Sequence, residues 1–376
     1  MTHVPDTASQ DLLARLAGIA VDSALAQARS TRHAATLSTQ ASYQALFAPH
    51  DALHVPLAVR FAVAARSAEL HEDQALAAHY RALQAQHWLD ADQRVKLEAA
   101  LQHASLLTLT PVAASPQHLV ALGEAGWSPE GIVTLSQIIA FISFQSRVLF
   151  GLRLLVGGPN PEARATPAGA GDWHRQAQTA QGRPAPVAFT QQPLVWEPWL
   201  APLRSDELTA NATAVLKDLG LLGSDYFQLL ARDLPILKER TLTDRGIFFT
   251  HAGLPRAERE LAATVTSKVN GCIFCASVHA SRATQLAKRG DDVQRLLDVH
   301  PGEPLTSGQE PLWAAQIDFA AHLAATPIAL TPAHVQVLEA QGLDTLQLLD
   351  VVQSVAFFSW ANRLMLTLGE PFWPEQ

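Results

Sequence analysis

The sequence feature that most constrains the fold is an internal repeat. Residues 115–152 read SPQHLVALGEAGWSPEGIVTLSQIIAFISFQSRVLFGL, and residues 331–368 read TPAHVQVLEAQGLDTLQLLDVVQSVAFFSWANRLMLTL. The two segments align without a gap, at a constant offset of 216 residues. Their identical residues form the pairs Pro116/Pro332, His118/His334, Leu122/Leu338, Gly126/Gly342, Gln137/Gln353, Ala140/Ala356, Phe141/Phe357, Ser143/Ser359 and Arg147/Arg363. A unit that occurs twice predicts a fold built from two related halves.

Each copy of the repeat contains the signals of a short helix followed by a long one. Ser115 can cap the short helix, Pro116 suits its first position, and Gly126 can end it with a positive φ. Thr331 and Gly342 are the equivalent first and last signals of the second copy. The segment that follows runs for more than twenty residues with apolar side chains at helical spacing. We expect it to form the central core helix of each half.

The rest of the chain indicates an all-α protein. Ala- and Leu-rich segments such as 73–88 and 206–222 are common, and Val/Ile/Thr runs with a period of two are scarce. Residues 157–193 are rich in Gly, Pro, Ala and Gln and lack an apolar period. We therefore predict two tandem helical domains, a degenerate one without cysteines at 1–156 and a second one at 194–376, joined by a linker at 157–193.

Charge and composition exclude several classes of partner. The formal net charge is −8, so no basic excess is available for nucleic acid or anionic lipid. The longest apolar stretch, 132–156, is interrupted by Gln137, Gln145, Arg147 and Arg153, which favours a buried helix over a membrane span. The N-terminus lacks the cationic start of a secretory signal. Two cysteines among 376 residues cannot form a disulfide framework, and we expect a cytoplasmic protein.

Both cysteines lie in one stretch, NGCIFCASVH, at residues 270–279. A helical pattern runs from Pro255 to 269, Asn270-Gly271 predicts a tight turn, and a second helix is expected from Cys272 to Arg289, ended by Gly290. In that helix Cys275 and His279 are four residues apart and share a face, with Cys272 one turn earlier. Because the turn makes the two helices antiparallel neighbours, Glu260 can lie beside the same stripe.

A thiol pair at a helix N-terminus is suited to redox chemistry. The partial positive charge there, with a nearby imidazole, can lower a cysteine pKa from ~8.5 into the range ~3.5–7.5. A second thiol one turn away can capture a sulfenic acid as a disulfide before further oxidation. The departing oxygen of a peroxide needs a proton, which His279 can supply near neutral pH.

Other interpretations of these residues stay open at this point. Cys272 and Cys275 can be buried packing residues, or with His279 can supply three of the four ligands that structural zinc needs. His279 can bond a backbone carbonyl, and Glu260 can belong to a solvated charged face, RAERE. Covalent haem attachment is excluded because Ala276 stands where a histidine is required.

The spacing Glu260-x11-Cys272-x2-Cys275-x3-His279 resembles the E-x11-C-x2-C-x3-H signature of the alkylhydroperoxidase D (AhpD)-like family, within the carboxymuconolactone decarboxylase superfamily. The likeness is best over residues 226–288. A poorer N-terminal copy joined to a copy that bears the motif is similar to two-domain peroxidase-related members. The resemblance implies an all-helical antioxidant fold that assembles into homo-oligomers. The best-known members have a histidine at the position of Phe274.

The resemblance also implies roles for the four motif residues. Cys275 would reach the peroxide and Cys272 would close the disulfide, while His279 and Glu260 would move protons. By its electrostatics alone, the helix terminus favours Cys272 as the thiol with the lower pKa, whereas the spacing to His279 favours Cys275. The activity implied is that of a weak peroxidase and disulfide reductase, re-reduced by an external dithiol such as a thioredoxin-like or lipoyl protein. It calls for no cofactor and no metal.

The first half has no cysteine, so thiol chemistry is impossible there. His79 falls near the place of His279, and we expect this copy to act as a pseudo-subunit that covers the active one. For the repeated Ser and Arg pairs we favour a buried hydrogen-bond network, with substrate binding by Arg363 as the alternative. His118 and His334 are expected at the surface. Two competing functions are a decarboxylase or lactone-processing enzyme like the superfamily's other branch, and a non-catalytic assembly protein.

Overall fold

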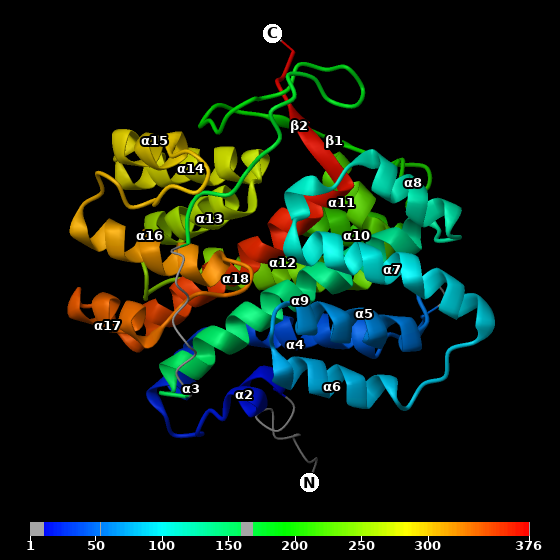
Figure 1. Ribbon diagram of the computed structural model, residues 1–376, viewed down its shortest axis with the longest axis horizontal. Coiled ribbons are helices and arrows are strands. Elements are labelled where there is room, and N and C mark those ends of the chain that lie inside the picture. The colour runs from blue at the N-terminus through cyan, green and yellow to red at the C-terminus, as the bar shows by residue number, and fades with distance from the viewer. Residues whose placement is uncertain (1–10, 53, 159–167, 376) are drawn as a thin grey trace.

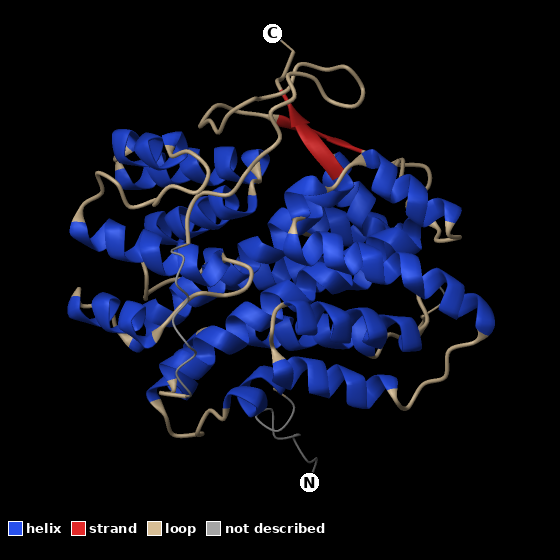
Figure 2. Ribbon diagram, viewed as in Figure 1, coloured by secondary structure: helices blue, strands red, loops and turns tan. Residues whose placement is uncertain are grey.

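The computed structural model describes residues 11–52, 54–158 and 168–375. Within these residues the chain is almost entirely helical, and its one sheet has two short strands (Figure 2). The prediction of an all-α fold is confirmed.

The helices follow the chain order of the two halves. The first half contains α2 (Leu12–Ala17), α3 (Ala24–Thr31), α4 (His33–Phe47), α5 (Leu57–Leu70), α6 (Gln74–Gln84), α7 (Ala91–Leu109), the 3-10 helix η1 (Pro111–Ala113), α8 (Pro116–Glu124) and α9 (Pro129–Leu155). The second half contains β1 (Val195–Pro198), α10 (Ala210–Asp218), α11 (Asp225–Leu230), η2 (Ala231–Asp233), α12 (Leu234–Phe248), α13 (Arg256–Asn270), α14 (Ile273–Ala287), α15 (Gly290–Asp298), α16 (Pro311–Ala324), α17 (Pro332–Ala340), α18 (Thr345–Leu368) and β2 (Gly369–Phe372).

The two long helices of the repeat, α9 and α18, pack against each other at the centre of the molecule (Figure 1). In that view α5–α8 lie to the right of this pair and α13–α17 to its left. A Cβ atom at Gly151 would lie 2.5 Å from Cγ1 of Val352, so the absence of a side chain at 151 permits the close approach of the two helices. One hydrophobic core cluster includes residues of both halves, because the two central helices share it.

The short helices of the repeat begin in the same way in both halves. Ser115 and His118 form a reciprocal capping box at the start of α8, and Thr331 and His334 form the same box at the start of α17. In each box the backbone N–H of the capping residue donates to Nδ1 of the histidine over 3.1 Å. The recurrence of these histidines therefore has a structural cause.

The repeated arginines connect the two halves reciprocally. Arg147 of α9 donates to the backbone oxygen of Ala324, at the end of α16, over 2.6 Å. Arg363 of α18 donates to the backbone oxygen of Thr108, near the end of α7, over 3.0 Å. The two acceptors are 216 residues apart, the offset of the repeat. Both guanidinium groups are fully buried, and burial lowers the pKa of Arg363 to about 9. A buried network, and not substrate binding, accounts for this pair.

A buried ion cluster fixes the N-terminal helices to α18. Nε of Arg32 lies 2.6 Å from Oδ1 of Asp350, and the backbone N–H of Leu254 donates to Oδ2 of the same carboxylate over 2.8 Å. Arg259 is a second, more distant cation, with its Nη2 atom 3.4 Å from Oδ2. All three ionic side chains are almost completely buried. Asp350 therefore holds together segments from both halves and the loop that precedes α13.

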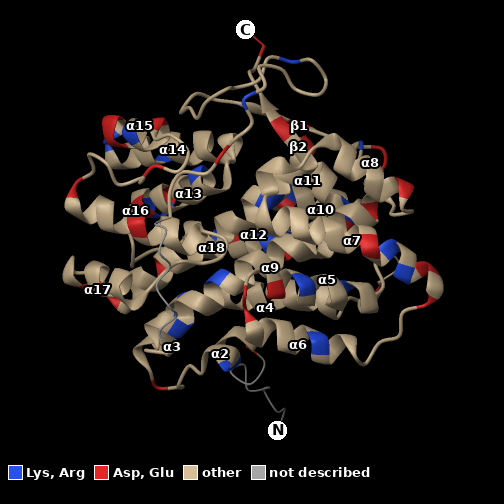
Figure 3. Ribbon diagram, viewed as in Figure 1, with Lys and Arg blue, Asp and Glu red and all other residues tan. Residues whose placement is uncertain are grey.

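Helix α9 has the length and apolar composition to cross a membrane, the only such helix in the described part of the chain. In this structure 78% of its most apolar window is buried against other helices. The expectation of a buried core helix at 132–156 is therefore confirmed. Acidic and basic residues are mixed on outer helices such as α7 and α15 (Figure 3), as the charge balance suggests.

The described part of the linker, 168–193, packs over the second half. The backbone N–H of Gly171 donates to the oxygen of Lys268 in α13 over 3.1 Å. Nζ of Lys268 lies 4.6 Å from the ring centre of Trp173 and 4.1 Å from that of Phe189. The chain then forms β1, which pairs antiparallel with β2 so that Val195 faces Phe372. The linker and this sheet thus cover the end of α13 from which the cysteine segment starts.

Candidate active site

The two cysteines lie at the junction of α13 and α14. Gly271 follows the end of α13 in the left-handed conformation, with a φ of 78°. A Cβ atom there would lie 2.2 Å from the backbone oxygen of Asp172, so both the conformation and the linker require glycine. Cys272 is the N-cap residue of α14, and Cys275 lies in the first turn of that helix. Both thiols are thus at a helix N-terminus.

The expected role of Gly290 as the end of this helix is wrong. Helix α14 ends at Ala287, and Lys288 adopts the left-handed conformation with a φ of 59°. Gly290 is instead the first residue of α15. A Cβ atom on it would lie 3.3 Å from Cγ2 of Thr284, so close packing between α14 and α15 accounts for the missing side chain.

Glu260 and His279 form the polar centre of the site. Glu260 is 1% exposed, so its predicted alternative as part of a solvated face is wrong. Its Oε2 atom lies 2.5 Å from Nδ1 of His279, and its Oε1 atom lies 2.6 Å from Nε of Arg256. Burial raises the pKa of Glu260, but the hydrogen bonds from His279 and Arg256 outweigh it, and the pKa lies below its ordinary value.

The imidazole of His279 is oriented by these contacts. An ionised Glu260 accepts the hydrogen bond from Nδ1–H, which leaves Nε2 of His279 as the proton acceptor. The ring packs edge-on against Phe358, with 4.1 Å between ring centres, and lies 6.1 Å from the ring of Phe248. A bond from His279 to a backbone carbonyl, the bland alternative, is not formed in the described structure. The carboxylate and two aromatic rings thus hold one tautomer in one orientation.

Burial makes Cys272 the less acidic kind of thiol, against the expectation from the helix terminus. Its side chain is 2% exposed, and desolvation raises its pKa well above the ordinary value. The hydrogen bond with the Cys275 thiol acts in the same direction, while the amide of Asn362 and the backbone N–H of Cys275 act against it. The loss of hydration outweighs the helix dipole here because almost no water reaches the sulfur.

The two thiols line different cavities. Cys275 lines an open cavity of about 500 Å³, together with His279. Cys272 lines a narrow cavity of about 30 Å³, where only one or two waters fit. Phe274, Trp196 and Met365 line both cavities and so form the partition between them. Cys275 is therefore the thiol that faces space large enough for an organic molecule.

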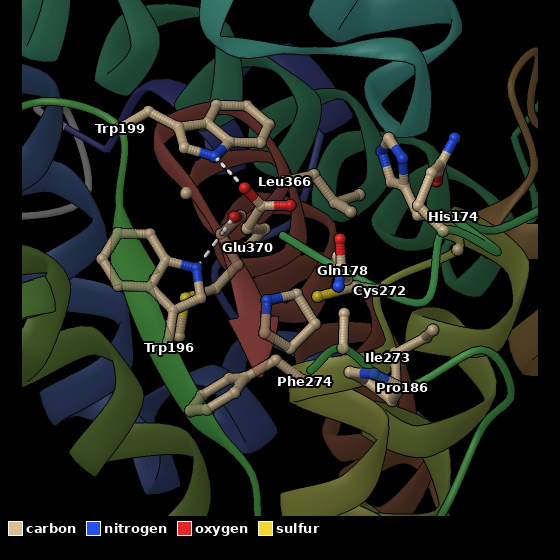
Figure 4. Close-up of a pocket in the computed structure, with 16 residues that line it drawn as sticks. His174, Gln178, Pro186, Trp196, Trp199, Cys272, Ile273, Phe274, Leu366 and Glu370 are labelled. Atoms are coloured by element: carbon tan, nitrogen blue, oxygen red, sulfur yellow. Dashed lines mark hydrogen bonds between the residues drawn. The ribbon is translucent and has the colours of Figure 1, made fainter. Parts of the chain in front are cut away.

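Linker and sheet residues close the narrow cavity on the side of Cys272 (Figure 4). Gln178 and Pro186 of the linker lie beside the cysteine in this view. The indole N–H of Trp199 donates to Oε1 of Glu370 over 2.8 Å, which holds β2 against the chain that leads out of β1. The cover shields Cys272 and leaves Cys275 accessible from the opposite side.

Three polar residues of the large cavity were not predicted from the sequence: Tyr226, Arg240 and Asp244. Tyr226 comes from α11, and the other two lie one turn apart on α12. Burial raises the pKa of Asp244, and its proximity to Arg240 and His279 lowers it to a smaller extent. The spacing of Arg240 and Asp244 on one helix face was the only signal in the sequence. It is too common on helices to identify a site by itself.

In the first half, Asp73 takes the place of Cys272 as the N-cap residue of the corresponding helix, α6. Counted from the N-cap residue, the counterpart of His279 is Tyr80, so the placement of His79 was wrong by one residue. The hydroxyl of Tyr80 donates to Oε1 of Gln145 over 2.5 Å in the core. This half therefore has packing residues at the positions that form the site in the second half.

His79 itself has a different partner. Its Nε2 atom lies 2.9 Å from the hydroxyl of Tyr43, on α4. Burial, with a smaller contribution from Arg15, lowers the pKa of His79 to about 4, so the imidazole is neutral at physiological pH. It contributes to the packing of the first half and lies outside the thiol site.

One group of metal-binding side chains occurs in the described part of the chain, formed by Asp318, His322 and His334. It contains neither cysteine. Nδ1 of His322 bonds the backbone oxygen of Asp318 over 2.8 Å, and Nδ1 of His334 serves the capping box of α17. Hydrogen bonds within the fold thus account for these imidazoles.

Comparison with known proteins agrees with the motif. Residues 236–300 match the model of the carboxymuconolactone decarboxylase family, and this range contains all four motif residues. Among solved structures, an uncharacterised peroxidase-related protein from Silicibacter sp. TM1040 is similar at 21% identity, with a TM-score of 0.36. The similarity covers 46% of this chain and 88% of that one. No curated protein matches the chain.

Proposed function

Because residues 236–300 belong to the carboxymuconolactone decarboxylase family, we propose that this chain is an AhpD-like thiol peroxidase and disulfide oxidoreductase. The observation that carries the proposal is the shared cavity of Cys275 and His279, with Glu260 bonded to the far side of the imidazole. A nucleophile, a base and a group that orients the base are the parts that activation of a thiol requires. The substrate would be an organic hydroperoxide.

In the first step, Nε2 of His279 takes the proton of Cys275, and the thiolate attacks the terminal oxygen of the hydroperoxide. The S–O bond forms and the O–O bond breaks. The alkoxide leaves with the proton from His279, which gives an alcohol and a sulfenic acid on Cys275. Glu260 supports this step because its negative charge stabilises the imidazolium that carries the proton.

In the second step, the sulfur of Cys272 attacks the sulfenic acid of Cys275. The S–S bond forms, the S–O bond breaks, and the hydroxide leaves as water with the proton of Cys272. An external dithiol then reduces the disulfide by exchange and becomes a disulfide itself, which balances the two electrons delivered to the peroxide. We assign the first attack to Cys275, because Cys272 has a raised pKa and faces the narrow cavity.

The partners and assembly are part of the same proposal. The reductant would be a thioredoxin-like or lipoyl-bearing protein, for which a dithiol of low potential is the required chemistry. A cytoplasmic location supports it, because the thiols must be kept reduced between turnovers. We also propose a homo-oligomer, to be tested by light scattering on the purified full chain.

Turnover of cumene hydroperoxide with dithiothreitol as reductant tests this function. We expect Cys275→Ser to abolish turnover, and Cys272→Ser to stop the cycle at the sulfenic acid, which dimedone will trap. Ser277→Ala on the same helix is the matched control, because Ser277 bonds only the backbone oxygen of Phe274 among its described contacts. Full activity of the variant that lacks both cysteines would exclude the proposal and favour chemistry that needs no thiol, such as decarboxylation.

A further inference from the structure

A buried cation without an ionic partner lies in the wall of the large cavity. Arg240 of α12 is 5% exposed and forms no ion pair or hydrogen bond with the described residues. Its guanidinium carbon lies 5.0 Å from the ring centre of Phe357 and 5.8 Å from that of Tyr226. The rings fix the position of the guanidinium, but they leave its N–H groups without acceptors. A buried charge in this state is costly to the fold, and natural proteins retain it where a ligand supplies the partner.

A second polar group beside Arg240 also lacks a partner. Tyr226 is 6% exposed, and its hydroxyl has no hydrogen-bond partner in the described structure. Burial raises the pKa of Tyr226 to about 12, with a smaller opposite effect of Arg240, so the group stays a phenol and can donate. Two adjacent donors without acceptors in one wall define a site for an anion or a strong acceptor.

The remaining wall of the cavity is mostly apolar. It is formed by aromatic and aliphatic side chains, chiefly Phe227, Phe274, Val278, Phe358, Ala361 and Met365. A volume of about 500 Å³ lies within the range of pockets that hold small organic ligands. The combination of a paired donor site and an apolar wall fits an amphiphilic molecule with one negatively charged group.

The charges that face this site decide the sign of the ligand. Asp244 also lines the cavity but forms no ion pair with Arg240, and burial favours its neutral form. Glu260 lies behind His279, where Arg256 and His279 bind both of its oxygens. Arg240 is therefore the one cation of the cavity whose charge is not already compensated by a direct contact.

We propose that Arg240 and Tyr226 bind the carboxylate of the substrate, so that the enzyme acts on hydroperoxides of carboxylic acids. The apolar part of the molecule lies along Phe358 and Phe274, and the hydroperoxide group reaches Cys275. The hydroperoxide part of this statement rests on the proposed function, whereas the carboxylate site stands on the cavity alone.

Binding is tested without turnover on the full-length Cys275→Ser chain, by calorimetric titration with decanoate and with decanol. We expect decanoate to bind more tightly than decanol, and Arg240→Met to weaken decanoate binding by about tenfold or more because a charge-assisted hydrogen bond is lost. Tyr226→Phe should weaken it less, and Asp244→Asn should leave it unchanged or tighten it. Equal binding of the acid and the alcohol, or an unchanged affinity in Arg240→Met, would overturn the proposal.

Two controls separate loss of the site from loss of the fold. Arg204→Met removes an exposed guanidinium outside the cavity and should leave decanoate binding unchanged. Arg240→Met should melt at a temperature equal to or above that of the parent chain, because the variant no longer buries an unpaired charge. Arg240→Lys, which keeps the charge, should retain part of the decanoate affinity. If it retains none while a neutral methionine binds as tightly as arginine, the assignment is wrong.

Turnover of linoleic acid hydroperoxide and of its methyl ester distinguishes the two proposals. Preference for the acid in the parent chain, lost in Arg240→Met, supports both. If neither compound is turned over while decanoate still binds through Arg240, the peroxidase proposal fails and the carboxylate site stands. Equal turnover of acid and ester without decanoate binding leaves the peroxidase and removes the site.

Discussion

The Nδ1 atom of His279 lies 2.5 Å from Oε2 of Glu260, although the two residues belong to different helices. Both oxygens of the carboxylate are bound, one by His279 and the other by Arg256. This contact fixes which nitrogen of the imidazole faces the thiol cavity, and it therefore connects the acidic residue of α13 to the chemistry of α14.

Glu260→Gln should lower the rate of peroxide reduction by about 10²-fold, within the range for loss of support to a general base. Because glutamine cannot stabilise an imidazolium, the pH at which the rate falls should also move to a higher value. Steady-state rates from pH 5 to 9 give both quantities. Glu258→Gln, two residues away and bonded to Gln316, is the matched control and should leave the rate profile unchanged.

The two thiols should react with alkylating agents at different rates. Burial raises the pKa of Cys272, so its thiolate fraction stays small until the pH passes that raised value. At pH 7 iodoacetamide should therefore label Cys275 at least about tenfold faster, as peptide mass spectrometry will show. In the Cys275→Ser chain, labelling of Cys272 should increase only at strongly alkaline pH. Faster labelling of Cys272 at neutral pH would contradict the assignment of the attacking thiol.

Acid should remove the contribution of Glu260 to stability. The folded pKa of Glu260 lies below that of an unfolded glutamate, about 4.3, so its charged form stabilises the fold. This contribution is complete above the unfolded value and is lost as the pH falls through the folded value. The difference in unfolding free energy between the parent chain and Glu260→Gln should thus shrink from pH 6 to pH 3 in urea titrations.

Glu258 provides the opposite case, because burial raises its pKa. The parent chain should lose stability relative to Glu258→Gln as the pH rises through the unfolded value. The same trend for both glutamates would show that the contacts of Glu260 do not stabilise its charge.

Asp350→Asn should destabilise the protein by about 3–5 kcal/mol, because it leaves the buried Arg32 without its anion. Urea unfolding measures this change. A chain that carries both Arg32→Met and Asp350→Leu should be more stable than Asp350→Asn alone, since no uncompensated charge is then buried. Additive losses in the double variant would show that packing, and not the ion pair, accounts for the effect.

The sequence predicted the parts of the fold that depend on local signals. Capping residues and apolar spacing identified both copies of the repeat, and the Asn270-Gly271 turn placed Cys272 at the start of a helix. The spacing of the motif also joined Glu260 to His279 correctly, because one tight turn determines how two antiparallel helices align. The predicted domain boundaries stay a prediction, and the shared core shows that the halves do not pack independently.

Contacts between distant segments were not predictable. Tyr226 and Arg240 reach the cavity from α11 and α12, and no spacing relates them to the cysteines. The raised pKa of Cys272 depends on the linker and the sheet that cover it, so a rule for exposed helix ends gave the wrong direction. The error at His79 arose because a helix position was counted without its N-cap residue, Asp73.

The most direct test of the central claim is the reaction of the fully reduced chain with one equivalent of cumene hydroperoxide, followed by intact-mass and peptide mass spectrometry. The account predicts a loss of two hydrogen atoms per chain and a single disulfide between Cys272 and Cys275, with one equivalent of cumyl alcohol formed. A chain that keeps both thiols free while the peroxide is consumed, or that does not consume the peroxide, would contradict it.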